Sequence, residues 1–205
     1  MKGMVIAMSA PEDIELKARN DDECAPRLLL HCCCAPCASY ALEYLSHQYR
    51  ITILFFNPNI QPREEYIKRA EELGKLLTLV TYPNPVDKIV AEYDPTAFKS
   101  AAEPFLEEPE GGNRCRECFK LRLGETAALA KAGGYDLFAT TLTVSPHKSA
   151  PVINEVGAEL AESFGVEYLR SDFKKKDGYR RSVELSKQYG LYRQLYCGCS
   201  SSMVL

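Results

Sequence analysis

Residues 27–37 read Arg-Leu-Leu-Leu-His-Cys-Cys-Cys-Ala-Pro-Cys, an apolar run that leads directly into a cysteine-rich turn. A second apolar run, residues 51–56 (Ile-Thr-Ile-Leu-Phe-Phe), stops at an Asn-Pro-Asn sequence. Short runs of this kind are typical of buried parallel strands. The segments that follow them, residues 39–48 and 64–77, place apolar side chains at helical spacing. The sequence therefore begins with two strand–helix units.

The same alternation continues through the rest of the chain. We expect a third strand at residues 78–82, a fourth at 135–142 and a fifth at 166–170, with a helix at 119–131 and another before the fifth strand. A chain of 205 residues with 46% hydrophobic content can bury one core. Together these features predict a single α/β domain with a mostly parallel sheet and flanking helices.

One long segment, residues 83–113, interrupts this pattern. It contains five prolines and ends in two glycines, so it cannot form one regular element. Only residues 86–93 have a helical pattern. Since long loops in compact domains are commonly functional, we expect the remainder to pack over the site.

The sequence also predicts the cellular setting. No stretch approaches the roughly 20 apolar residues of a membrane span, and residues 1–20 lack the pattern of a secretion signal. We therefore expect a cytoplasmic protein without a membrane partner. Thiols stay reduced in the cytoplasm, where clustered cysteines more often bind metal or perform redox chemistry than form structural disulfides.

Eight of the nine cysteines fall into three groups, and Cys24 stands alone. The groups are Cys32, Cys33, Cys34 and Cys37; Cys115 and Cys118; and Cys197 and Cys199. Closely spaced thiols can converge on one soft metal centre or exchange electrons as a dithiol. The chain is therefore interpreted as a metallo-thiol enzyme, with Cys24 expected to be a small buried side chain.

The first group follows the first predicted strand, at the edge where open parallel sheets bind ligands. A helix that begins near Pro36 would direct its backbone N–H groups at this loop and favour anionic ligands. Cys33 and Cys34 can share a centre only if the chain has already turned there. Cys32 is expected to pack inward.

Cys115 and Cys118 are three residues apart directly before the helical run, so both sulfurs would lie on one side of a first helical turn. Sulfur ligands leave zinc or an iron–sulfur cluster as candidates. A full α/β core exists without the metal, and this favours the cluster.

Cys197 and Cys199 flank Gly198, and such a pair closes a disulfide only with strain. Strained disulfides cycle readily, so the pair is interpreted as a redox-active dithiol. The alternative is two further metal ligands.

Charge is unevenly distributed along the chain. The net charge is −3, yet residues 168–196 carry eight bases and three acids. This basic segment predicts a local contact with a polyanion, and the alternative is a solvated face.

The motifs together resemble the cobalamin-independent, QueH-type epoxyqueuosine reductases, from about residue 28 to residue 199. The resemblance is carried by the cysteine-rich run 31–37, Phe-Asn-Pro-Asn-Ile at 56–60, Cys-Arg-Glu-Cys at 115–118 with Leu-Arg-Leu at 121–123, Thr-Thr-Leu at 140–142, Ser-Pro-His-Lys at 145–148, Asp-Phe-Lys-Lys-Lys at 172–176 and Tyr-Cys-Gly-Cys at 196–199. Residues 1–26 lie outside it, so we expect an N-terminal extension followed by an α/β metalloenzyme domain at residues 27–205. Cys24 and Cys32 match no residue of the family's motifs.

The resemblance implies a fold like that of the adenine nucleotide alpha-hydrolases. It also implies the reaction, two-electron removal of the epoxide oxygen from epoxyqueuosine at the wobble position of tRNA, which is the last step of queuosine synthesis. An external electron donor, which the sequence does not identify, would reset the enzyme.

The same resemblance assigns roles to individual residues. Cys33, Cys34, Cys115 and Cys118 look like the ligands of a [4Fe-4S] cluster, and Cys197 with Cys199 looks like the redox-active pair. Cys37 and Asp172 are candidate ligands of an additional mononuclear iron. His147 and Lys148 are candidates for proton donation or phosphate contact. In the basic segment, the lysines at 174–176, Arg180 and Arg181 could follow tRNA phosphates, with Tyr179 stacking on a base.

Overall fold

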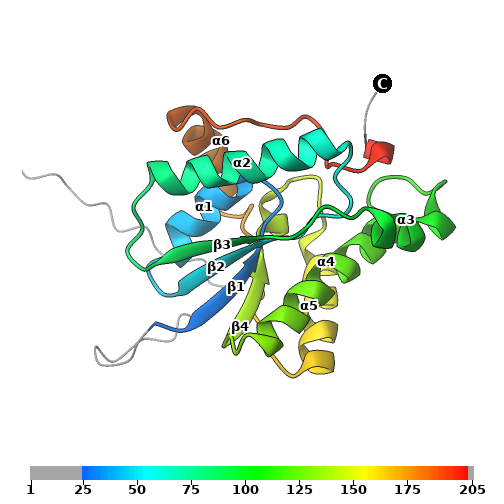
Figure 1. Cartoon of the computed structure of the whole chain (residues 1–205), viewed down its shortest axis with the longest axis horizontal. Coiled ribbons are helices and arrows are strands. Elements are labelled where there is room, and N and C mark those ends of the chain that lie inside the picture. The colour runs from blue at the N-terminus through cyan, green and yellow to red at the C-terminus, as the bar shows by residue number, and fades with distance from the viewer. Residues whose placement is uncertain (1–24, 203–205) are drawn as a thin grey trace, which may run out of the picture.

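The structure is a computed structural model that describes residues 25–202 (Figure 1). Five parallel strands form one sheet in the order β3-β2-β1-β4-β5. The strands are β1 (Arg27–His31), β2 (Arg50–Phe55), β3 (Val86–Val90), β4 (Leu137–Thr140) and β5 (Glu167–Tyr168). The helices are α1 (Ala35–Leu45), α2 (Arg63–Leu79), α3 (Thr96–Ala102), α4 (Asn113–Ala132), α5 (Ala150–Phe164) and α6 (Gly178–Gln188), with short 3-10 helices η1 (Glu103–Phe105), η2 (Thr141–Val144) and η3 (Ser200–Ser202). The predicted α/β class with a parallel sheet is confirmed.

Helices cover both faces of the sheet, as Figure 1 shows. Leu28 and Leu30 of β1 face a core that includes residues of α1, α2 and α6, whereas Leu29 faces a second core built with α4 and α5. Successive residues of a strand point to opposite faces, so a continuous apolar run at 28–30 requires cover on both sides. The three-layer architecture follows from this requirement.

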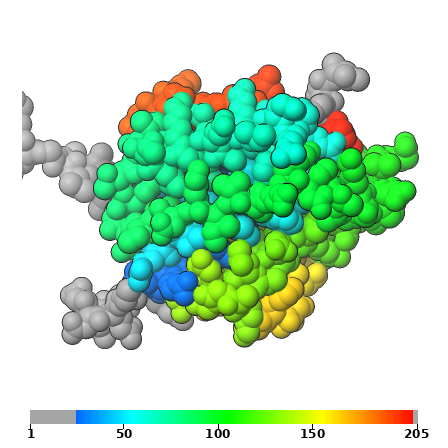
Figure 2. All heavy atoms as spheres, viewed as in Figure 1, coloured from blue at the N-terminus to red at the C-terminus, as the bar shows by residue number. Residues whose placement is uncertain are grey.

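The sequence placed the third strand wrongly. Residues 78–82 were expected to form it, but α2 continues to Leu79, and the strand is β3, within the segment expected to be helical. β3 pairs in parallel with β2 at the sheet edge, and four of its five residues are exposed. An edge strand with one paired side lacks the apolar alternation that identifies a strand in sequence. Seen from this edge, the segment from α2 to α3 spans the middle of the molecule (Figure 2).

The strand order reverses at β1, which lies between β2 and β4. In open parallel sheets, ligands bind at the carboxyl ends of the strands where the order reverses. Three loops meet at this point in the structure, namely residues 32–34 after β1, 56–62 after β2 and 141–149 after β4. Within residues 25–202, no helix is both long enough and apolar enough to span a membrane.

Candidate metal and redox centre

Three thiols gather directly after β1. The chain turns at Cys33, Cys34 is the N-cap of α1, and Pro36 occupies the first helical turn, as the sequence predicts. The sulfur atoms of Cys33, Cys34 and Cys37 all lie within 4.8 Å of one another, and those of Cys33 and Cys34 are 3.9 Å apart. The turn therefore brings neighbouring cysteines into one group, the Cys33 triad, which could hold a metal.

The thiols of the Cys33 triad differ in their readiness to ionise. Hydrogen bonds from the thiols of Cys34 and Cys37 hold the pKa of Cys33 well below its usual value, and the positive charges of Arg122 and Lys148 add to this effect. The same contact with Cys33 raises the pKa of Cys34 to about 12. Cys33 is therefore the first of the three to become a thiolate.

Cys32 is separate from the triad. Its side chain is fully buried in the core shared with α1, and its Sγ donates to the Cys34 carbonyl oxygen over 3.2 Å. Burial raises the pKa of this thiol well above its usual value. The expectation that Cys32 packs inward is confirmed.

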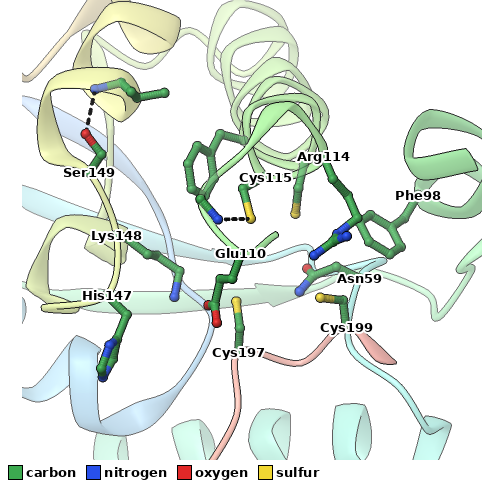
Figure 3. A pocket seen from close by; sticks show the side chains of 14 residues that line it. Asn59, Phe98, Glu110, Arg114, Cys115, His147, Lys148, Ser149, Cys197 and Cys199 are labelled. Atoms are coloured by element: carbon green, nitrogen blue, oxygen red, sulfur yellow. Dashed lines mark hydrogen bonds between the residues drawn. The ribbon is translucent and has the colours of Figure 1, made fainter. Parts of the chain in front are cut away.

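The remaining four described cysteines together line one cavity (Figure 3). Cys115 and Cys118 lie in the first turn of α4, as predicted, and Cys197 and Cys199 enter from the C-terminal segment on the opposite wall. Burial raises the pKa of Cys118 to about 12, and the Gly111 backbone N–H donates to Cys115 Sγ over 3.2 Å. The structure thus joins the second and third cysteine groups of the sequence.

The C-terminal thiol pair is held by backbone contacts. Arg69 of α2 is fully buried, and its guanidinium donates to the carbonyl oxygens of Tyr196 (3.3 Å) and Cys197 (3.0 Å). Gly198 has φ +132°, and its carbonyl oxygen accepts from the Gln61 backbone N–H over 2.9 Å. All eight cysteines in residues 25–202 are free thiols.

A larger cavity of about 450 Å³ adjoins both thiol groups. Its lining includes Cys33, Cys37, Cys197, Glu110, His147, Lys148, Tyr179, Arg193, Gln194, Leu195 and Tyr196. This volume is in the range of cavities that bind small organic molecules. Leu195 at its edge is 100% exposed, and Tyr179 is 40% exposed. The guanidinium of Arg193 lies 5.8 Å from the centre of the Tyr179 ring.

Four residues line both cavities, namely Glu110, His147, Lys148 and Cys197. In Figure 3 the side chains of Glu110 and Lys148 point toward Cys197. Burial by itself would lower the pKa of Lys148, but the thiolates of Cys197 and Cys33 raise it, so the ammonium group stays charged. A cation and two groups of thiols therefore meet where the cavities join.

A buried arginine lies between the thiol groups. Arg122 of α4 is 1% exposed, and its Nη1 is 3.8 Å from Cys118 Sγ. Its Nη2 donates to Asn57 Oδ1 over 2.6 Å, and its Nε faces His31 Nε2 at 3.3 Å. Burial, together with the charge of Arg122, lowers the pKa of His31 to about 3, so this imidazole is neutral.

Asp172 lies apart from the thiols and lines neither cavity. Its Oδ1 is buried without a hydrogen-bond partner in the described residues, although Lys174 Nζ lies 3.6 Å away. A buried oxygen that accepts no hydrogen bond is suited to be a metal ligand. Among the described residues, however, the ligand atoms that lie close enough to share a metal are those of the Cys33 triad, and Asp172 is not part of this group.

Much of the basic segment is paired within the protein. Lys174 donates to the Lys148 carbonyl oxygen over 2.7 Å, Arg181 forms an ion pair with Glu43 (2.6 Å), and Arg180 pairs with Asp177 (3.1 Å). These charges are therefore partly compensated before any polyanion binds.

Several site residues carry no signal that identified them from sequence. Arg69 and Glu110 look like ordinary helix or loop charges until the fold buries the first and turns the second toward the thiols, and Arg122 is part of the Leu-Arg-Leu motif at 121–123 but had no role assigned to it. Asn57 and Asn59 belong to a quoted motif but had no assigned role. Their position could have identified them, because two side-chain amides directly after a buried strand lie at the edge of the sheet where ligands bind.

The donor set fits a soft metal centre. Six thiols line the two cavities, and thiolates suit iron–sulfur clusters or zinc. Cys34 belongs to this set through its contacts with Cys33 and Cys37. Cys24 lies outside the described residues.

Comparisons with known proteins found similar sequences and a similar structure. The family model described as "Epoxyqueuosine reductase QueH" matches residues 28–204. A protein named epoxyqueuosine reductase QueH from Streptococcus pyogenes is 44% identical over 185 residues, which cover 89% of this chain and 72% of the relative. The protein of the same name from Staphylococcus epidermidis is 45% identical over 85% of this chain and 75% of its own length. Among solved structures, a predicted tRNA methyltransferase subunit from Methanocaldococcus jannaschii superposes with a TM-score of 0.47 at 17% identity over 76% of each chain.

Proposed function

Because the chain belongs to the epoxyqueuosine reductase QueH family, we propose that it removes the epoxide oxygen of epoxyqueuosine in tRNA, the final step of queuosine synthesis. The observation that carries the proposal is a cavity bordered by thiols of two groups at the point where the strand order reverses. We also propose a cytoplasmic location, which a tRNA substrate supports.

The chemistry requires two electrons and two protons for each epoxide. The two carbon–oxygen bonds break, an alkene forms, and the oxygen leaves as water. Oxidation of the Cys197 and Cys199 thiols to a disulfide supplies two electrons and two protons, so the step balances. An external reductant then returns the pair to the dithiol. Gly198 gives the backbone freedom that such a short loop needs.

Cys33, Cys34, Cys115 and Cys118 would hold a [4Fe-4S] cluster. Both pairs approach Arg122, whose guanidinium contacts Cys118 and whose charge also lowers the pKa of Cys33. When bound, the cluster supplies one-electron transfer and a Lewis acid for the leaving oxygen. Cys37 and Asp172 are the proposed ligands of an additional mononuclear iron, supported by the contacts of Cys37 in the triad and by the buried Asp172 Oδ1, which accepts no hydrogen bond within the described residues.

The 450 Å³ cavity would receive the modified nucleoside. Enzymes that act on a base within RNA draw it out of the stack into a pocket. Lys148 carries a charged ammonium group beside Cys197 and can deliver a proton to the departing oxygen. His147 lines the same cavity and is the second candidate for proton transfer or phosphate contact.

Metal analysis and turnover of thiol variants test the proposal. After anaerobic reconstitution, we expect about four iron and four sulfide per chain for one cubane cluster. Cys33→Ser, Cys34→Ser, Cys115→Ser and Cys118→Ser should each lose the cluster absorbance. Cys32→Ala is the matched control from the same turn. It should keep the cluster because its sulfur faces the core.

The redox pair is tested in the same preparations. Cys197→Ser and Cys199→Ser should abolish reduction of epoxyqueuosine in tRNA while they keep iron, and oxidised wild type should contain the 197–199 disulfide. Iron loss in these variants equal to that of the first group would make the pair metal ligands. Stoichiometric zinc without iron in the wild type would exclude the cluster.

A further inference from the structure

Arg122 is a buried charge that the reaction chemistry described so far does not use. It follows Cys118 by one helical turn of α4, is 1% exposed, and points into the space between β1, the loop after β2 and the thiols. Its three nearest partners are Asn57 Oδ1 at 2.6 Å, His31 Nε2 at 3.3 Å and Cys118 Sγ at 3.8 Å.

None of these partners is an anion when the thiols are protonated. Arg122 can only donate, and the His31 ring that it faces is neutral. His31 is held by contacts of its Nδ1 with Thr140 Oγ1 (2.9 Å) and of its Nε2 with the Phe56 carbonyl oxygen (3.3 Å). Asn57 is held in turn by a hydrogen bond from its Nδ2 to the Cys32 carbonyl oxygen (2.8 Å). These neighbours fix the guanidinium in place without neutralising it.

Three other cations lie near the thiols. Arg114 is also buried, and its Nη1 donates to the carbonyl oxygens of Leu106 and Glu108. Arg69 forms an ion pair with Glu65 Oε1 at 2.7 Å, and Lys148 is only partly buried. In the part of the chain that the structure describes, no carboxylate forms an ion pair with Arg122. Burying a charge without a partner is strongly unfavourable. The remaining source of negative charge is the set of cysteines, which become thiolates when they bind a metal.

We infer that Arg122 is the counter-cation of the thiolate centre, so that metal binding and the burial of Arg122 stabilise each other. The inference rests on the thiolate centre of the proposed function, but not on which metal that centre holds. Arg122 is a positioning and charge-compensating residue. It contacts Cys118 and lines neither cavity.

Cobalt(II) is a suitable probe because its thiolate charge-transfer band reports thiolate ligation whatever the native metal. Metal-free full-length protein would be titrated anaerobically, with Arg122→Gln to remove the charge and Arg122→Lys to keep it. Loss of partners around metal ligands costs roughly 10–100-fold in metal affinity, which is the loss expected for Arg122→Gln. Arg122→Lys should lose much less. The control is Arg116→Gln on the same helix, whose charge is already paired with Glu155 and Glu159, and its affinity should be unchanged.

Unfolding by urea separates charge compensation from a plain structural role. Because the negative charge beside Arg122 increases when the cysteines bind a metal, Arg122→Gln should destabilise the cobalt form more than the metal-free form. Equal loss of cobalt affinity in the Gln and Lys variants would overturn the inference, as would equal destabilisation of both forms by Arg122→Gln. If the wild-type protein binds cobalt but assembles no iron–sulfur cluster, the proposed cofactor is wrong and the role of Arg122 is unaffected. If the wild-type protein does not bind cobalt, the proposed thiolate centre and the role of Arg122 are both wrong.

Discussion

At the scale of single residues, Gly198 controls the geometry of the dithiol. Its φ of +132° lies in a region that other residues rarely adopt, and a Cβ placed there would be 2.9 Å from Ile60 Cγ1. Residue 198 must therefore be glycine for two reasons: the positive φ disfavours other residues, and the loop after β2 leaves no room for a Cβ.

We expect Gly198→Ala to lower turnover at least tenfold while the iron content is kept, because the shifted loop separates the two thiols from the cavity. Gly190→Ala is the matched control. Gly190 also has a positive φ, +58°, but a Cβ there would meet nothing within 4 Å, so this variant should lose only about 1 kcal/mol of stability. Turnover on modified tRNA and iron analysis measure both. Equal loss of turnover in the two variants would show that backbone strain alone is responsible.

The sequence identified the cysteines of the site but not the side chains that surround them. Clustered cysteines can be recognised in a sequence by their chemistry and spacing. The sulfur atoms of Cys33, Cys34 and Cys37 do lie close together, as the turn after β1 predicts. Arg122 and Arg69 are two of many arginines in the sequence. Only the packing of α4 and α2 against the sheet shows that they are buried.

At the scale of elements, a close approach of α5 to β5 shapes the sheet edge beside β4. Gly157 of α5 packs against Tyr168 of β5, and a Cβ on Gly157 would lie 2.4 Å from the Tyr168 ring. The Tyr168 hydroxyl also donates to Asn154 Oδ1 over 3.1 Å. The helix can cover this edge only because residue 157 has no side chain.

Gly157→Ala should therefore destabilise the protein by about 1–3 kcal/mol, the usual range for overpacking. Gly124→Ala on α4 provides the contrast, since its Cβ would meet only Leu160 Cδ2, at 3.8 Å. That replacement should stabilise the helix by roughly 0.5–1 kcal/mol. Urea denaturation gives both values. A stable Gly157→Ala variant would mean that Tyr168 moves aside at little cost.

Elements differ in how well the sequence specified them. The strands in the middle of the sheet, β1, β2 and β4, were predicted because each contains a run of mostly apolar residues that is buried on both faces. β3 was not, because its sequence, Val-Asp-Lys-Ile-Val, is half solvated and its conformation depends on pairing with β2. The β-branched residues at 78–82 suggested a strand, yet residues 78 and 79 complete α2.

At the scale of the whole molecule, the C-terminal segment links the redox pair to the RNA-binding face we propose. It runs alongside α2, where the Tyr192 backbone N–H donates to Glu72 Oε1 over 3.0 Å and Lys75 Nζ donates to the Gly190 carbonyl oxygen over 2.6 Å (Figure 1). Arg193, from the same segment, lies at the larger cavity. The cavity that holds the nucleoside and the thiols that reduce it are thus partly built from one stretch of chain.

We expect Arg193→Ala to weaken binding of an anticodon stem-loop and to reduce the slope of log affinity against log salt by about 0.7–0.9, the loss of one phosphate contact. Lys88→Ala, on the exposed edge strand β3, is the control and should change neither quantity. Fluorescence anisotropy at several salt concentrations measures both. If only a triple replacement of the lysines at 174–176 changes the slope, the phosphates lie along the basic segment instead.

The full exposure of Leu195 has a practical consequence for observing the enzyme. The chain contains no tryptophan, so an indole introduced at position 195 would be its single tryptophan and could be excited at wavelengths where the 12 tyrosines absorb little. That position is at the edge of the larger cavity, beside the stacked Arg193 and Tyr179 pair. A single optical signal from this site could follow the arrival and departure of RNA in real time, on the same sample in which the thiols are titrated.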